Sequence, residues 1–368
     1  MILKIGEMIK SLRKEQDITQ EKLAAYLNIS YQAISKWENG TAYPDITLVP
    51  QIANFFGVSS DELLGINKDE HTAELKVYEE KRRKLNQLGK VMPIIELCRE
   101  VLQKYPRNYE WMLNLAYALT SYNCTEDQVE YSKEHHFIEE AISLCERIRE
   151  DCTIDHIRHG ATQILCYQYP NLGKKELAIE LACQMPQMII CQELLLEHIY
   201  DGEEKVKQSQ ENLILMVDNC ALSLSCMSAG VLEKSLTLDE KIQYIKASNT
   251  LYQTIFLKDE DSLFYNCRLS FNYRRLATFY CQKGDSEEAL KYLLLAEKCA
   301  SNYDRAYTEE EQHYKSIFVN HCTHNSKQCG KNYESTERQI LLESMQNPVF
   351  DLVRETEEFK SLLKKLNH

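Results

Sequence analysis

The stretch from Thr19 to Gly40, TQEKLAAYLNISYQAISKWENG, restricts the possible folds of this chain more than any other part of it. Its apolar residues recur at helical spacing in two short runs that are separated at Asn28. Asn tolerates the left-handed backbone conformation in which many helices end, and Thr19 and Ser30 are suitable N-caps for the two runs. Ala24 is small enough to let two helices cross closely. The stretch therefore predicts a helix-turn-helix, a motif whose second helix can enter the major groove of DNA.

The order and spacing of more than a dozen residues resemble the Cro/repressor class of bacterial regulators, also called the XRE family. The resemblance covers roughly residues 3 to 66. It is carried by Thr19, Gln20, Leu23, Ala24, Ile29, Ser30, Ile34, Ser35, Trp37, Glu38, Asn39, Gly40, Pro44, Asp45, Val58, Ser59, Asp61, Glu62, Leu63 and Leu64. Asn28 departs from the family, which often has Gly at this position. The resemblance implies a five-helix domain that binds a double-stranded DNA operator.

The resemblance also implies which side chains meet the DNA. Tyr31, Gln32 and Lys36 match the family's base-facing positions. A Gln can bind adenine with two hydrogen bonds, a Lys can reach the acceptors of guanine, and an aromatic ring can pack on a thymine methyl group. Gln20 and Asn39 match positions that contact phosphates. The alternative for each of these residues is a solvated surface side chain.

The first predicted helix contributes three further basic residues. Lys10 and Lys14 are predicted to contact DNA phosphates. In the resembling family, the residue that matches Arg13 pairs with the residue that matches Glu38, and such a pair fixes the orientation of helices. Contact with a phosphate is the alternative role of Arg13.

The charge of the chain is unusual for a protein that binds DNA. Its net charge is -13, and residues 1–66 contain six basic and eight acidic side chains. The chain therefore lacks a broad basic surface, and affinity for DNA must come from local contacts and from helix N-termini that point at phosphates. The acidic remainder should be held away from the duplex.

The remainder of the chain predicts helices throughout. It has few Gly and Pro residues, 11 and 7 in the whole chain. We predict a polar linker at residues 67–72 and an α-solenoid of helical hairpins at residues 73–368, so that the fold is all-α. The clearest hairpin is Tyr273–Ala300, which resembles a tetratricopeptide repeat in the spacing of its Ala residues and in the Gly of its turn. Periodic helices of another α-solenoid are the alternative.

A curved stack of hairpins has a concave face that can bind a ligand. The layout resembles regulators of Gram-positive bacteria whose repeat domain binds a short signalling peptide. On the repeat match, the positions that face the groove are Arg83, Asn86, Tyr117, Arg274 and Gln282. These side chains could hydrogen-bond the backbone of an extended peptide. The alternative is that the repeats bind a partner protein and that the DNA-binding domain only recruits this scaffold to DNA.

Other motifs give weaker indications. His321, Cys322, His324 and Cys329 have the side chains that zinc prefers, but their spacing matches no known site, and the stretch resembles a flexible loop. We therefore expect no metal and no cofactor. The chain has no nucleophile elbow, phosphate loop or HExxH helix, so we expect no enzymatic activity.

The sequence also predicts where the protein acts. No apolar stretch is long enough to span a membrane, and the first residues lack the apolar core of a signal peptide. We expect a cytoplasmic protein. Because residues 1–66 carry so few basic groups, one such domain should not hold a DNA site alone. We therefore also expect a homodimer.

Overall fold

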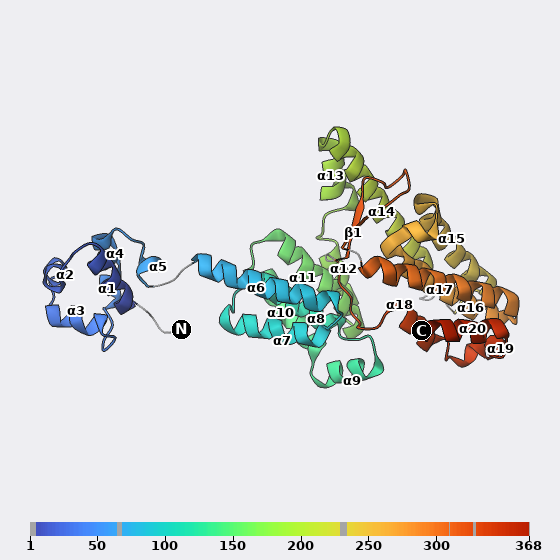
Figure 1. Cartoon of the computed structure of the whole chain (residues 1–368), viewed down its shortest axis with the longest axis horizontal. Helices are drawn as coiled ribbons and strands as arrows, with labels where there is room; N and C mark the ends of the chain where they lie inside the picture. Colours follow the sequence, from blue (N-terminus) through green and yellow to red (C-terminus); the bar gives the residue numbers. More distant parts are fainter. Residues whose placement is uncertain (1–4, 65–67, 229–233, 309, 327–328, 368) are drawn as a thin grey trace. The chain divides into compact units, whose positions relative to one another are not determined.

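The chain forms two compact, mainly helical units, which a computed structural model shows for residues 5–64, 68–228, 234–308, 310–326 and 329–367 (Figure 1). The units are Met1–Glu80 and Lys81–His368. The predicted all-α class is confirmed, apart from one short pair of strands.

The first unit holds five short helices around a small core. They are α1 (Ile5–Glu15), α2 (Gln20–Leu27), α3 (Tyr31–Glu38), α4 (Val49–Phe56) and α5 (Ser60–Leu63), with a 3-10 turn, η1 (Ile46–Leu48), before α4. Ile9, Leu23, Ile34, Ile52 and Leu63 come from five different helices and are fully buried. Burying a side chain of this size contributes about 1.5–3 kcal/mol, so this core accounts for the packing of α3 against the other helices.

The helix ends agree with the sequence except at one cap. The Thr19 hydroxyl accepts a hydrogen bond from the Lys22 amide, and Asn28 ends α2 in the left-handed region with φ 55°. Ser30 occupies the N-cap position of α3, but its hydroxyl makes no capping hydrogen bond there. The start of α3 therefore depends on packing more than on its cap.

The predicted linker is mostly helical. Residues 68–72 form the first part of α6 (Lys68–Gln87), and residue 67 lies outside the described residues. The reason is visible in the sequence, because no Gly or Pro interrupts residues 68–87. The division between the two units falls inside this helix, after Glu80.

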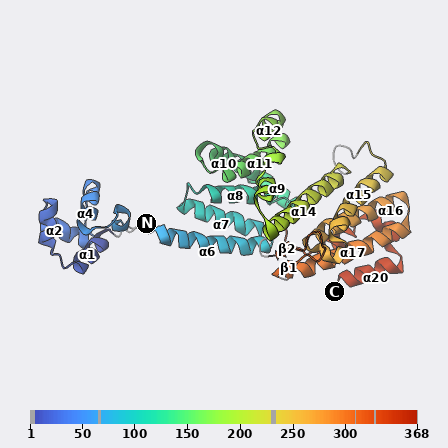
Figure 2. The ribbon, with the colours of Figure 1, turned by 90° about the horizontal axis from the view of Figure 1, so that it is seen from above.

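The second unit begins with helices that pack on their neighbours in sequence (Figure 2). They are α7 (Val91–Lys104), α8 (Tyr109–Ser121), α9 (Glu126–Glu134), α10 (Phe137–Asp151), α11 (Asp155–Gln168), η2 (Tyr169–Leu172) and α12 (Lys175–Ala182). α8 packs on α7, α10 and α11. The small helix α9 interrupts the series, and Ala141 and Cys145 of the following helix, α10, are fully buried.

Longer helices follow. They are η3 (Met188–Ile190), α13 (Gln192–Ile199), α14 (Gly202–Met227), α15 (Leu238–Phe256), η4 (Asp259–Tyr265), α16 (Asn266–Lys283) and α17 (Ser286–Thr308). α16 and α17 form the hairpin predicted for Tyr273–Ala300, and Gly284 makes their turn with φ 78°. Ala277 of α16 and Ala289 and Ala296 of α17 are fully buried where the two helices pack together.

The end of the chain packs on this hairpin. It contains α18 (Glu337–Ser344), η6 (Pro348–Phe350), α19 (Asp351–Arg354) and α20 (Glu357–Leu366). Phe350 and Phe359 are fully buried against the same core as α16 and α17. The C-terminal helices therefore close one end of the apolar core of the second unit.

The stretch around His324 is not the loop that we predicted. β2 (Thr323–Asn325) pairs antiparallel with β1 (Glu311–His313), and Gln312 lies opposite His324. Cys322 and His324 are buried, whereas Thr323 between them is exposed. This alternation is the period of a strand.

Candidate nucleic-acid interface

The exposed side of α3 carries the three predicted base-contacting residues. Ile34 and Trp37 are buried and attach one side of the helix to the core. Tyr31, Gln32 and Lys36 point away from this core and are exposed, Tyr31 by 50%. α3 thus presents an aromatic ring, an amide and an ammonium group on one solvent-facing side, which together can hydrogen-bond and pack against base edges.

A buried carboxylate holds α3 to α1 and α2. Arg13 Nε and Nη2 donate to Glu38 Oε1 and Oε2 at 2.7 and 2.9 Å, and Arg13 Nη1 donates to the Ile18 carbonyl at 2.8 Å. Gln20 Nε2 donates to Glu38 Oε2 at 2.8 Å. The structure therefore contains the Arg13–Glu38 ion pair that the resemblance implies, and it adds Gln20 to it.

The hydrogen bonds in this cluster keep Glu38 charged. Burial raises the pKa of Glu38, but the hydrogen bonds from Arg13 and Gln20 lower it further, so that the pKa is below its ordinary value. The same hydrogen bond raises the pKa of Arg13. The pair is therefore ionised at neutral pH, and it fixes α3 relative to the two preceding helices.

The predicted phosphate-contacting residues differ in their surroundings. Lys14 and Asn39 are exposed, and Asn39 Nδ2 lies 3.4 Å from Ser35 Oγ. Lys10 and Gln20 are half-buried, and the amide of Gln20 already donates to Glu38. Gln20 therefore also positions α3, a role that the sequence did not reveal.

The five predicted groove residues do not converge on one site. Asn86 and Tyr117 line a cavity of about 220 Å³ between α6 and α8. Arg274 and Gln282 line a different cavity, between α16 and the C-terminal helices. Arg83 lies on the exposed side of α6.

Two of the His and Cys residues near β2 lie close together in the structure. Cys329 Sγ lies 3.8 Å from His324 Nδ1, and burial lowers the pKa of His324. The described residues contain no group of three or more His, Cys, Asp or Glu side chains that could hold a metal ion. They also contain no helix that is both long and apolar enough to cross a membrane.

Comparison with known proteins supports the assignment of the first unit. Residues 9–63 match the family described as helix-turn-helix. The HTH-type transcriptional activator BcrR of Enterococcus faecalis is 44% identical over 62 residues, which are 17% of this chain and 30% of that protein. The antitoxin PezA of Streptococcus pneumoniae is 35% identical over 92 residues, 24% of this chain and 58% of that protein. The first unit thus contains a helix-turn-helix domain of the kind found in curated transcriptional regulators.

These similarities concern only part of each protein. The chain spans 30% and 58% of the lengths of the two relatives. Among solved structures, PlcR of Bacillus thuringiensis, in complex with a peptide and DNA, aligns over 83% of this chain and 95% of its own. It is 16% identical, with a TM-score of 0.29. A similarity of this size carries no conclusion about the ligands of this chain.

Proposed function

We propose that this protein is a cytoplasmic, sequence-specific DNA-binding transcriptional regulator. The observation that carries the proposal is α3, whose buried side fixes it in a helix-turn-helix domain while Tyr31, Gln32 and Lys36 stay exposed. In this motif the second helix reads base edges in the major groove. Gln32 would bind adenine, and Lys36 would reach guanine.

The phosphate contacts in this proposal set the position of α3 on the duplex. These contacts would come from four residues in or near the motif: Lys10, Lys14, Gln20 and Asn39. Contacts with phosphates do not distinguish one base pair from another. The Arg13–Glu38 pair keeps α3 in place without contacting DNA. Few phosphates are neutralised in this arrangement, so affinity should depend on salt less steeply than in a strongly basic protein.

The proposal includes a homodimer, and an apolar segment of the second unit supports it. Residues 172–206, here called the apolar segment, expose Leu172, Leu177, Ile179, Met188, Ile189, Ile190, Leu195, Ile199 and Val206. None of the eight residues of α13 is fully buried. α13 is held to α14 by the side chain of Asn212, which donates to the Glu193 carbonyl and to Glu197. Exposed apolar residues in such number mark an interaction surface. We assign a second copy of this chain to this surface, because a motif with few basic groups needs two half-sites.

The second unit would act as the sensor of the regulator. Its stacked helices can change shape by small rotations that add up along the stack. A peptide or another ligand in one of its cavities would then alter DNA binding. The proposal assigns no catalytic role to either unit.

Selection of bound duplexes from a random-sequence DNA library tests the proposal. The full chain should enrich a two-fold symmetric site with half-sites about one helical turn apart. Gln32→Ala should relax the preference at one base pair of each half-site by roughly 1–3 kcal/mol. Gln51→Ala, an equal change at an exposed position of α4, should leave the site unchanged. Failure to enrich any sequence would show that the chain is not a sequence-specific DNA-binding protein.

A further inference from the structure

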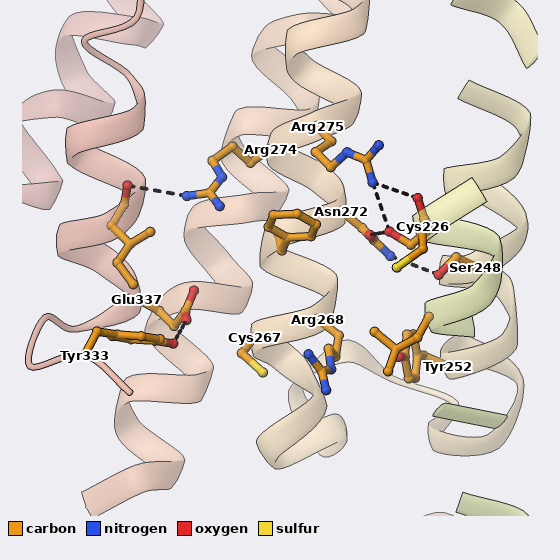
Figure 3. A pocket seen from close by; sticks show the side chains of 14 residues that line it. Cys226, Ser248, Tyr252, Cys267, Arg268, Asn272, Arg274, Arg275, Tyr333 and Glu337 are labelled. Atoms are coloured by element: carbon orange, nitrogen blue, oxygen red, sulfur yellow. Dashed lines mark hydrogen bonds between the residues drawn. The ribbon is translucent and has the colours of Figure 1, made fainter. Parts of the chain in front are cut away.

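A cavity of about 480 Å³ lies between α14, α15, α16 and α18 in the second unit (Figure 3). Its walls are mostly apolar, with Leu222, Phe271 and Ile340 among the residues that line them. Cavities of this size that combine apolar walls with a few convergent polar groups are typical of small-ligand sites. The DNA-binding role of the first unit does not account for this cavity.

One side of the cavity is fixed by a hydrogen-bonded cluster. Asn272 of α16 accepts from the Ser225 hydroxyl of α14 at 2.8 Å and donates to the Ser248 hydroxyl of α15 at 3.1 Å. Arg275 donates to the Ser225 carbonyl at 2.9 Å and to the Ser228 hydroxyl at 2.8 Å. These contacts join three helices, so this wall is rigid before any ligand binds.

The opposite side contains a guanidinium without a close anionic partner. Figure 3 shows Arg274 reaching from α16 toward α18, where its Nη1 donates to the Ile340 carbonyl at 3.5 Å. This is a long hydrogen bond, and no carboxylate in the described part of the chain forms an ion pair with Arg274. Burial lowers the pKa of Arg274, which means that its charge is poorly compensated.

Glu337 attracts Arg274 through space, but it forms no ion pair with Arg274 in the described part of the chain. Glu337 is buried, and its Oε1 accepts from the Tyr333 hydroxyl at 2.6 Å. Burial also raises the pKa of Glu337. The third guanidinium of the cavity, Arg268, already pairs with Asp218 at 3.6 Å. Arg274 is therefore the cation that an anionic ligand would meet.

An aromatic ring lies beside this cation. The Cζ atom of Arg274 is 5.4 Å from the ring centroid of Phe271, and that of Arg275 is 5.6 Å away. Phe271 is 46% exposed although it lines the cavity. An apolar group next to Arg274 could cover this ring and remove apolar surface from water.

We propose that this cavity binds a ligand with an apolar body and one carboxylate, which pairs with Arg274 while the apolar body packs on Phe271, Leu222 and Ile340. The planar fork of an Arg side chain matches a carboxylate with two parallel hydrogen bonds. A doubly charged phosphate fits less well, because the Glu337 carboxyl group faces the same cavity. The carboxylate can belong to a free organic acid or to the C-terminus of a peptide. This inference rests on the sensor role proposed for the second unit, and it names the chemistry of the ligand.

Calorimetric titration of the full chain without DNA tests the inference. The probes are octanoate and 4-phenylbutyrate as free acids, N-acetyl-Leu-Phe as a peptide C-terminus, and the amide of each. At least one acid should bind about tenfold more tightly than its amide. Arg274→Gln should lower the affinity for the acid to that for the amide and leave the amide unaffected. The acid that binds more tightly, a free organic acid or the peptide C-terminus, identifies the source of the carboxylate.

Two further variants separate binding from folding. Arg305→Gln, at an exposed Arg of α17, should leave every affinity unchanged. Phe271→Ala removes an exposed ring, so the chain should fold, and it should weaken acid and amide alike. Equal binding of acid and amide, an equal loss of both in Arg274→Gln, or no binding of any probe to the folded chain would overturn the inference. Because DNA is absent, none of these outcomes bears on the DNA-binding proposal.

Discussion

Glu38 attaches α3 to the two helices that precede it. Its two carboxylate oxygens accept three hydrogen bonds from Arg13 and Gln20, so that one side chain joins α1, α2 and α3. Glu38→Gln removes the charge but keeps the shape. We expect it to destabilise the first unit by about 1.5–3 kcal/mol, the range for a hydrogen bond to a charged group. Urea unfolding should be followed by the fluorescence of Trp37 in a Trp111→Phe background, since the chain has only 2 Trp residues.

The same carboxylate gives the first unit a pH-dependent stability. The pKa of Glu38 in the folded state is below its ordinary value of 4.5. Its stabilising effect is therefore complete above the unfolded pKa and is lost as the pH falls through the folded pKa. Between pH 6 and about pH 3, the wild-type Trp37 transition should lose more stability than that of Glu38→Gln. Parallel pH profiles would contradict the role of Glu38 as an ionised partner of Arg13.

Gly6 shows a second constraint on α3, from the backbone. A Cβ atom at this position would overlap with the carbonyl oxygen of Trp37. α1 and α3 therefore touch at a residue without a side chain. Gly6→Ala should destabilise the first unit by about 1–3 kcal/mol, the usual cost of overpacking, although Ala favours helices. Glu7→Ala, at the exposed neighbouring position, should change the Trp37 transition little, and equal stability of both variants would show that α1 can shift.

Neither α13 nor η3 contains a buried residue. Ile189 is 74% exposed, and the apolar segment around it is proposed to bind a second copy. Ile189→Asp would place a charge in that interface, where burial without a partner is costly. It should convert the dimer to a monomer in sedimentation equilibrium. Ile317→Asp changes a position that is 71% exposed but lies outside the apolar segment, and it should leave the dimer intact. If the wild-type chain is itself a monomer, the proposed dimer is wrong.

The elements also show what a sequence alone can predict here. The hairpin of α16 and α17 was predicted because its Ala residues and Gly284 lie at local, regular intervals. The 311–325 hairpin was missed because each strand has only three residues. The cavity between α14, α15, α16 and α18 could not be predicted from the sequence. Its residues Ser225 and Asn272 are 47 positions apart, and no local pattern joins them. The sequence predicts a phosphate contact for Gln20 and gives no sign of its hydrogen bond to Glu38. That hydrogen bond also depends on how the helices pack.

At the scale of the whole molecule, charge favours the dimer over a single DNA-binding domain. A net charge of -13 repels DNA at a distance, and the first unit offers few phosphate contacts. Two first units on one operator would double those contacts. We expect the first unit alone, residues 1–80, to bind the selected operator far more weakly than the full chain in gel-shift titrations. Equal affinities would show that the second unit contributes nothing to DNA binding.

The sensor role makes a prediction that involves both units. If a ligand in the second unit alters operator binding, the operator must alter ligand binding by the same factor, because the two equilibria are linked. Such coupling is typically about 1–3 kcal/mol, or about 5- to 150-fold in affinity. The carboxylate probe that binds most tightly should therefore be titrated into the full chain with the selected operator and with a scrambled duplex of equal length. The affinity should differ between the two duplexes, and the operator affinity measured with and without probe should change by the same factor. Arg274→Gln should abolish both changes while leaving operator binding in the absence of probe as it is. If the probe binds equally well with either duplex, the second unit holds the dimer together or recruits a partner protein, and it does not sense this ligand.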